Sequence, residues 1–125
     1  MKKNVTFYWC EICGNIVGLI KNGGGELVCC GEPMVELLAN TTDASGEKHV
    51  PIVSKKDGKI IVEVGSVAHP MNEKHYIEWI AVVSEKRTER ISLFPTDEPK
   101  AIFCDEPNAE VYAYCNLHGL WKASV

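Results

Sequence analysis

The chain has 125 residues, the size of one domain or of one modest domain that carries a small module. Its net charge of −4 at pH 7 argues against a general nucleic-acid-binding protein, which would need a basic surface. No stretch approaches the roughly 18 apolar residues of a membrane span.

The sequence begins MKKNVTFYWC, where no long apolar segment follows the two lysines, so we do not expect a signal peptide. The chain has six cysteines. Without an export signal they are expected in the reducing cytoplasm, where clustered cysteine indicates metal binding or redox chemistry. The alternative is a disulfide framework in an oxidising compartment.

The first part of the chain, residues 1–36, carries four of the cysteines and little apolar mass. Two strand-like pieces, 5–9 and 25–29, lie on either side of glycine-rich NGGGE. So small a unit cannot bury enough surface to fold unaided, and a bound metal is the usual remedy. We predict a metal-stabilised domain over 1–36 and a second domain over 37–125, with the polar stretch 40–48 as linker and loop.

The second domain reads as a succession of short strands. The segments with strand character are 49–53, 59–64, 75–83, 90–94, 101–103 and 110–115. Asp57-Gly58 predicts a hairpin turn between the first two. In the third segment the apolar residues that alternate onto one face are Ile77, Trp79, Ala81 and Val83. Six or seven strands, with no amphipathic helix, predict an all-β fold, an antiparallel β-sandwich.

Two cysteine pairs in the first domain, Cys10-x-x-Cys13 and Cys29-Cys30, predict a metal site. Adjacent side chains on a strand point to opposite faces, so the second pair can face one metal only if the backbone turns there. Gly31 permits such a turn. Four thiolates favour zinc or iron, and the sequence does not distinguish them. Free or disulfide-bonded cysteines are the alternative.

A second candidate site combines the Cys-x-x-His of Cys115 and His118 with three more histidines. All the histidines fall in the strand-rich region, at expected strand ends or in loops: His49, His69, His75 and His118. Four imidazoles and one thiolate make one donor more than structural zinc takes. The set therefore favours iron with a coordination position left open opposite the sulfur, where a small molecule could undergo redox chemistry.

Two other functions stay open on this evidence. In the first, the chain is a non-enzymatic electron carrier or sensor, with the second site purely structural. In the second, both sites hold zinc and the β-domain is an interaction module. The five-donor count favours the open iron site over either.

Three motifs resemble those of superoxide reductases: EKHVP (47–51), HPMNEKHYIEWI (69–80) and CNLHG (115–119). Together with the N-terminal cysteines, they make nearly the whole chain similar to desulfoferrodoxins, the two-iron form of that family. Such proteins join a desulforedoxin-like domain to a neelaredoxin-like catalytic domain with an immunoglobulin-like sandwich. The resemblance implies two irons per chain. One is held by Cys10, Cys13, Cys29 and Cys30, and the other, ferrous iron is held by His49, His69, His75 and His118 in the equatorial plane and by Cys115 on the axis.

The implied activity is the one-electron reduction of superoxide to hydrogen peroxide, which detoxifies superoxide without releasing dioxygen. A reduced donor such as rubredoxin supplies electrons in the family, which is typically homodimeric and cytoplasmic.

The same resemblance places Glu47 and Lys48 on a loop over the open position. It implies that Lys48 attracts the anion and orders the water that supplies a proton, and that Glu47 is a reversible ligand of ferric iron once product leaves. Taken alone, the two residues read as a solvated charge pair on a mobile loop. The sixth cysteine, Cys104, has no partner nearby and is expected to be a free thiol that binds no metal.

Overall fold

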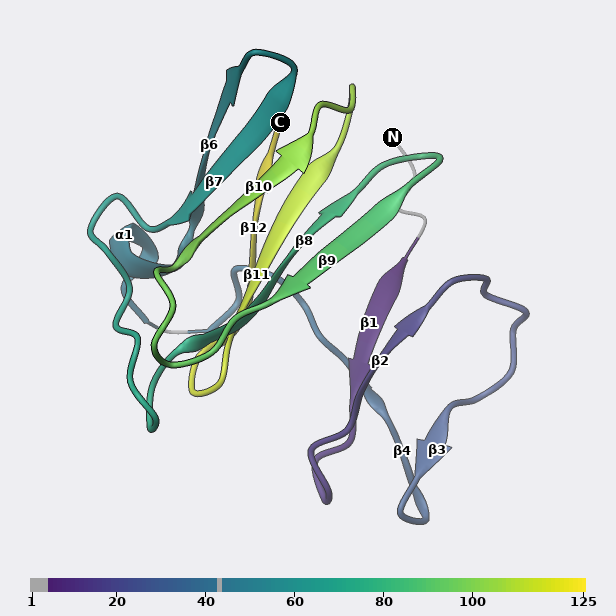
Figure 1. Cartoon of the computed structure of the whole chain (residues 1–125). Coiled ribbons are helices and arrows are strands. Elements are labelled where there is room, and N and C mark those ends of the chain that lie inside the picture. The colour runs from purple at the N-terminus through teal and green to yellow at the C-terminus, as the bar shows by residue number, and fades with distance from the viewer. Residues whose placement is uncertain (1–4, 43) are drawn as a thin grey trace.

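The computed structural model describes residues 5–42 and 44–125 (Figure 1). The first four residues, with the two lysines considered in the signal-peptide prediction, and Asp43 in the predicted linker lie outside the described residues. Within the described ranges the chain forms short strands and one helical turn, α1 (Gly46–His49). No helix in these ranges is long and apolar enough to cross a membrane.

The N-terminal unit is built from very short strands. They are β1 (Thr6–Trp9), β2 (Ile16–Leu19), β3 (Val28–Cys29), β4 (Glu32–Pro33) and β5 (Val35–Glu36). β1 lies between β2 and β5, and β3 pairs with β4 as a separate ribbon. The predicted strands at 5–9 and 25–29 are present, the second of them shortened. The other three were not predicted, since two or four residues are too few to show an alternating pattern.

The rest of the chain forms a two-layer sandwich, as predicted. Its strands are β6 (Pro51–Lys56), β7 (Lys59–Val64), β8 (Ile77–Val83), β9 (Thr88–Ser92), β10 (Lys100–Cys104), β11 (Glu110–Cys115) and β12 (Gly119–Ser124). One sheet has the order β10-β7-β6 and the other β12-β11-β8-β9, and the pairings within them are antiparallel. The all-β prediction is confirmed, although β12 was missed beside the Cys-x-x-His motif.

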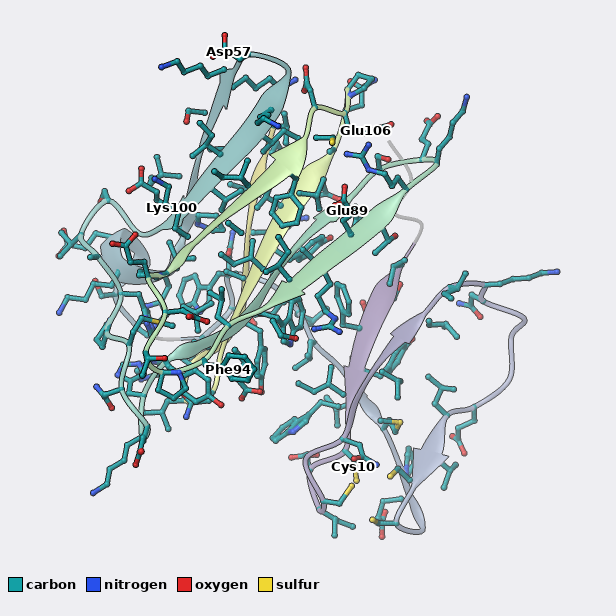
Figure 2. The ribbon with its side chains drawn as sticks, in the orientation of Figure 1. Cys10, Asp57, Glu89, Phe94, Lys100 and Glu106 are labelled. Atoms are coloured by element: carbon teal, nitrogen blue, oxygen red, sulfur yellow. The ribbon has the colours of Figure 1, made fainter. Side chains whose placement is uncertain are left out.

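The turn predicted at Asp57-Gly58 is confirmed. Both residues have positive φ, 53° and 75°, and the flanking Lys56 and Lys59 pair across β6 and β7. Positive φ at two successive residues is the geometry of the two-residue hairpin turns whose twist matches that of the strands. Figure 2 shows Asp57 at the tip of this hairpin.

The main core fills the space between the two sheets. Its most deeply buried members include Ile60 and Val62 on β7, Ile80 and Val82 on β8, and Val111 on β11. Full burial of a valine or isoleucine side chain stabilises a fold by about 1.5–3 kcal/mol, so this layer dominates the stability of the domain.

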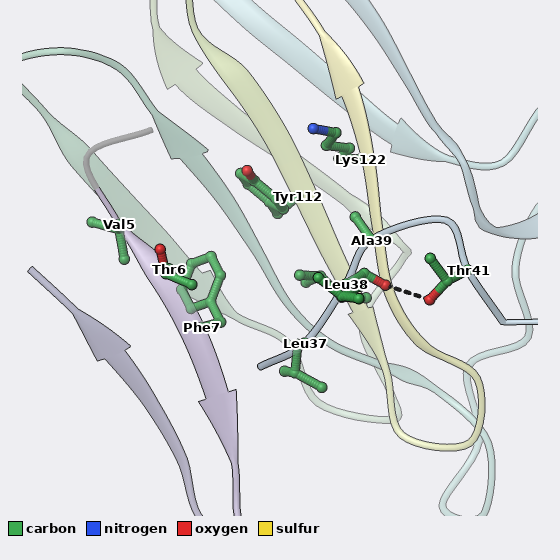
Figure 3. A pocket seen from close by; sticks show the side chains of 10 residues that line it. Val5, Thr6, Phe7, Leu37, Leu38, Ala39, Thr41, Tyr112 and Lys122 are labelled. Carbon is green, nitrogen blue, oxygen red and sulfur yellow. Dashed lines mark hydrogen bonds between the residues drawn. The ribbon is translucent and has the colours of Figure 1, made fainter. Parts of the chain in front are cut away.

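A second apolar layer joins the N-terminal unit to the sandwich. Phe7 of β1 packs on the outer face of the four-stranded sheet, with its ring centroid 5.0 Å from that of Trp79 and 5.5 Å from that of Tyr112. Figure 3 shows the same contact region, where β1 and the segment 37–41 border a cavity of about 280 Å³ beside β11 and β12. The inner face of the four-stranded sheet thus meets the main core, and its outer face is covered along β8 and β11.

The prediction that Ile77 shares a face with Trp79, Ala81 and Val83 is wrong. Trp79 pairs with Tyr114 but Ile77 pairs with Cys115, so one extra residue, Glu78, interrupts the ladder. Such a bulge reverses the side-chain alternation. Ile77 consequently packs in the core between the sheets, whereas Trp79 faces the N-terminal unit.

Candidate metal centres

The four N-terminal cysteines come together at one end of the N-terminal unit. Their sulfur atoms all lie within 4.8 Å of one another. Cys10 follows β1 and is buried, whereas Cys13 and Cys30 are exposed and Cys29 is half-buried. Figure 2 shows Cys10 at the end of β1, with sulfur atoms beside it.

The local backbone explains how four sulfurs converge. The amide of Gly14 donates to the carbonyl of Cys10 over 2.9 Å, and the Cys13 amide points at the Cys10 sulfur over 3.5 Å. At the second pair the turn predicted from sequence is present, because Cys30 and Gly31 both have positive φ, 54° and 77°. That conformation is rare for a residue with a Cβ.

The acidities of these thiols show that the cluster suits a cation. The backbone amide of Cys13 lowers the pKa of Cys10 to about 7, while the neighbouring sulfurs, that of Cys13 first, raise the pKa of Cys30 to about 12. One thiolate therefore forms readily, and neighbouring sulfurs raise the pKa of Cys29 as they do that of Cys30, so these two thiols resist losing their protons. A bound metal ion removes that resistance, which is the chemistry of a four-thiolate site.

The second cluster forms at the end of the sandwich that carries α1. His49 ends α1, His69 lies between β7 and β8, and His75 lies two residues before β8. Cys115 ends β11, and His118 lies in the turn before β12. Donor atoms of the first four, His49, His69, His75 and Cys115, all lie within 4.8 Å of one another. Nδ1 of His118 lies 3.1 Å from Nε2 of His49 and 3.9 Å from the Cys115 sulfur. All five predicted donors are thus brought together.

Two sequence predictions near His49 are wrong in detail. The strand expected from residue 49 begins at Pro51, and the predicted loop 40–48 ends in α1. The amide of Val50 donates to the carbonyl of Gly46 over 2.9 Å, which closes one helical turn and tucks the His49 ring inward. A single turn has no apolar periodicity by which a sequence could reveal it.

The imidazoles of His49 and His69 face each other in a way that suits one shared cation. Nδ1 of His49 donates to the carbonyl of Ser45, and Nδ1 of His69 donates to the carbonyl of Pro70, both over 2.7 Å. Burial lowers the pKa of both rings, that of His69 to about 4, so both are neutral near pH 7. Each Nε2 then carries a lone pair, and the two atoms are 3.2 Å apart. Neither can donate to the other, but both can bind one metal.

The remaining donors agree with this assignment. Nε2 of His75 is buried and has no hydrogen-bond partner among the residues that the structure describes. Burial raises the pKa of the Cys115 thiol, so a cation is needed to hold it as thiolate. The residues therefore fit a metal with one sulfur and four nitrogen donors, more than a closed tetrahedral zinc site takes.

Trp121 is a neighbour of the site for which no role was predicted. Its ring stacks on His49 with centroids 4.8 Å apart and planes inclined by 24°. Its Nε1 also donates to the carbonyl of His118 over 3.0 Å. Trp121 thus helps to position both His49 and His118. Its place three residues after His118 was the one feature of the sequence that could have indicated this role.

Glu47 and Lys48 lie on α1 beside His49, with both side chains exposed. The turn is anchored, not free. The carbonyl of Glu47 accepts hydrogen bonds from the amide of Val67 over 3.0 Å and from the hydroxyl of Ser66 over 3.2 Å. Gly65 packs so closely that an added Cβ would lie 2.7 Å from that carbonyl oxygen. In place of the expected loop, the structure has a helical turn that these contacts hold in position.

Cys104 belongs to neither cluster. It ends β10, is exposed, and forms no disulfide within the described residues.

Comparison with known proteins agrees with these two centres. A family model described as desulfoferrodoxin matches residues 41–124, and one described as its N-terminal domain matches residues 2–37. A protein named desulfoferrodoxin from Syntrophotalea carbinolica is 51% identical over 124 residues, which cover 98% of each chain.

Solved structures give the same relationship. The superoxide reductase from Treponema pallidum superposes with a TM-score of 0.76 at 31% identity, covering 95% of this chain and 98% of that one. A protein named superoxide reductase from Pyrococcus abyssi is 33% identical and aligns with 74% of this chain and 97% of its own length. Because the family's two models match residues 2–37 and 41–124, the chain belongs to the desulfoferrodoxin family.

Proposed function

We propose that the chain is a superoxide reductase, an oxidoreductase that reduces superoxide to hydrogen peroxide. The observation that carries the proposal is the pair of imidazole Nε2 atoms of His49 and His69, which face each other at 3.2 Å with both Nδ1 atoms already donating. Its support is a donor set of four histidines and one cysteine in a chain whose relatives include proteins named superoxide reductase.

The residues proposed to hold the catalytic iron are His49, His69, His75, His118 and Cys115. When bound there, ferrous iron would supply the single electron that the reaction needs. The buried Cys115 sulfur would add electron density to the site, and the neutral imidazoles would leave the iron its positive charge. The proposed ligands of the second iron are Cys10, Cys13, Cys29 and Cys30.

We further propose that the two irons lie in separate domains, 1–36 and 37–125. The matches to the two family models, which end at 37 and begin at 41, support a boundary in this segment.

The proposed function is tested by metal analysis combined with rapid mixing. Protein loaded with iron should contain two irons per chain, and the reduced form should develop a ferric absorption band as it consumes superoxide. Reduced rubredoxin should then return the protein to the ferrous state. Two zinc ions would favour an interaction module, and two irons without reaction would favour an electron carrier or sensor.

Lys48 is proposed to attract the superoxide anion and to order the water that supplies a proton to the product. Its exposed ammonium group lies on the same helical turn as His49. We expect Lys48→Ile to slow the second-order reaction with superoxide at least about ten-fold at low salt, because a charge beside a site raises the capture of an oppositely charged substrate. Stopped-flow or pulse-radiolysis rates measured at several salt concentrations check this.

The matched control is Lys59→Ile, which removes another exposed lysine, from the start of β7, at the hairpin marked by Asp57 in Figure 2. It should leave the rate and its salt dependence unchanged. Equal rates for the two variants would remove the steering role of Lys48.

Glu47, on the same turn, is proposed as the reversible ligand of oxidised iron.

We also propose a cytoplasmic homodimer that receives electrons from a rubredoxin-like donor. Thiolate ligands are stable in a reducing compartment. The small N-terminal unit carries several exposed apolar side chains: Ile12, Val17, Ile20, Val28 and Val35. Such a surface on so small a unit favours contact with a second copy. Sedimentation equilibrium should give twice the mass of one chain, and the mass of a single chain would contradict the dimer.

A further inference from the structure

Asn116, between two proposed metal ligands in sequence, makes a three-bond clamp across the end of the sandwich. Its Oδ1 accepts from the amide of Tyr76 over 2.9 Å, and its Nδ2 donates to the carbonyl of Lys74 over 3.0 Å. Its own amide donates to the carbonyl of Tyr76 over 3.2 Å. The clamp therefore grips the residues on both sides of His75.

The segment that carries His75 is otherwise folded back upon itself. Asn72 and His75 form an isolated bridge, with amide-to-carbonyl distances of 3.1 and 3.2 Å. The side-chain oxygen of Asn72 also accepts from the amides of Lys74 and His75, over 3.1 and 3.0 Å. These bonds shape the turn locally but do not fix where it sits relative to Cys115 and His118.

The His75 ring depends on that placement more than its neighbours do. The rings of His49 and His69 are each oriented by a 2.7 Å bond from Nδ1 to a carbonyl. The His75 ring is half-buried, and its buried Nε2 has no partner in the part of the chain that the structure describes. Its direction is therefore set largely by the backbone at 74–76, which Asn116 holds.

We infer that Asn116 is a positioning residue, which holds His75 at the right place against the loop of Cys115 and His118. The inference rests on the proposed metal-binding role of these residues. One amide side chain thereby ties together the two segments that supply three of the five donors. In a site assembled from separate loops, the residues that orient the metal ligands matter, because mutating them typically lowers metal affinity about 10–100-fold.

The chain contains a matched control for this clamp. Asn40 makes the same three bonds with β12: Oδ1 accepts from the amide of Lys122, Nδ2 donates to the carbonyl of Lys122, and its amide donates to the carbonyl of Leu120. Those distances are 2.9, 3.2 and 3.0 Å. Asn40 lies on the segment after the N-terminal unit, and these three bonds go to β12 and not to a proposed metal ligand, although Asn40 is more exposed than Asn116.

The test compares iron loss from Asn116→Ala, Asn40→Ala and the unchanged chain, each fully loaded with iron. A ferrous chelator measures release from the histidine–cysteine centre, while thiolate absorption shows that the four-cysteine centre stays filled. We expect release about ten-fold faster or more for Asn116→Ala and within about two-fold of the unchanged chain for Asn40→Ala. Equal release from both variants would overturn the inference.

A second comparison asks whether Asn116 acts through His75. In a chain that already carries His75→Ala, adding Asn116→Ala should change release by less than about two-fold, because residues that act as a unit are not additive. A full ten-fold additional effect would show that Asn116 acts elsewhere. If Asn116→Ala does not fold, Asn116→Asp takes its place. It keeps the acceptor for Tyr76 but sets a carboxylate oxygen against the Lys74 carbonyl, and it should also release iron faster than Asn40→Ala.

Failure of the inference is distinguishable from failure of the proposed function. If the unchanged chain holds no iron at the histidine–cysteine centre, the proposed function fails. If it holds iron and Asn116→Ala holds it equally well, only the role of Asn116 fails.

Discussion

Replacing Cys115 with serine is expected to lower iron retention at the histidine–cysteine centre by more than about 100-fold and to abolish reaction with superoxide. Residues behind metal ligands already change affinity about 10–100-fold, and a directly bound thiolate should matter more. The Cys115 side chain is fully buried at the end of β11. An external thiol therefore cannot reach the position of the lost sulfur. Iron content, loss of thiolate-to-iron absorption and the rate of superoxide consumption measure the effect.

The control is Cys104→Ser, which makes the same atomic change at an exposed thiol outside both clusters. It should leave iron content, absorption and rate as in the unchanged chain. A Cys115→Ser protein that keeps two irons and reacts normally would contradict the assignment of Cys115 as a donor. Because a buried hydroxyl without a partner costs about 1–3 kcal/mol, unfolding of the metal-free form should be measured alongside.

Gly65→Ala is expected to cost about 3 kcal/mol or more of folding stability and to slow the reaction with superoxide. Gly65 has a φ of 84°, and a Cβ there would lie 2.4 Å from the Val67 carbonyl oxygen and 2.7 Å from both the Glu47 oxygen and the Lys48 carbonyl carbon. Strain at positive φ costs about 1–3 kcal/mol, and overpacking adds about as much. The clash is with backbone atoms of the turn that carries Lys48, so the turn must move. Urea unfolding and stopped-flow rates test both effects.

Gly58→Ala separates backbone strain from the clash. Gly58 has a similar φ of 75°, but nothing lies within 4 Å of the position its Cβ would take. Only the backbone strain at positive φ remains, so we expect the folding stability to fall by about 1 kcal/mol and the reaction rate to stay normal. Equal losses from the two variants would mean that the close packing under α1 contributes nothing.

Much of the architecture could be predicted because its signals are local. The alternation of apolar residues, the Asp57-Gly58 turn and the paired cysteines each act within a few neighbouring positions. The turn required at Cys29-Cys30 followed from side-chain geometry alone, and positive φ at Cys30 and Gly31 agrees with it.

The details that escaped prediction depend on contacts distant in sequence. The bulge at Glu78 is a feature of the pairing between β8 and β11, and the sequence of β8 alone does not reveal it. The helical turn before His49 is held by residues 65–67, and Trp121 meets His49 across 72 positions of chain. The sequence predicted which residues are the metal donors, but it did not predict the contacts that orient their side chains.

The burial of the four-stranded sheet on both faces has a consequence for how the protein reaches its folded form. The outer face, with Trp79 and Tyr112, is covered by a unit too small to fold without its metal. A newly made chain short of metal would therefore present an aromatic sheet surface to other chains, a starting point for aggregation. Metal supply thus bears on the solubility of the nascent protein as well as on the chemistry of the finished one.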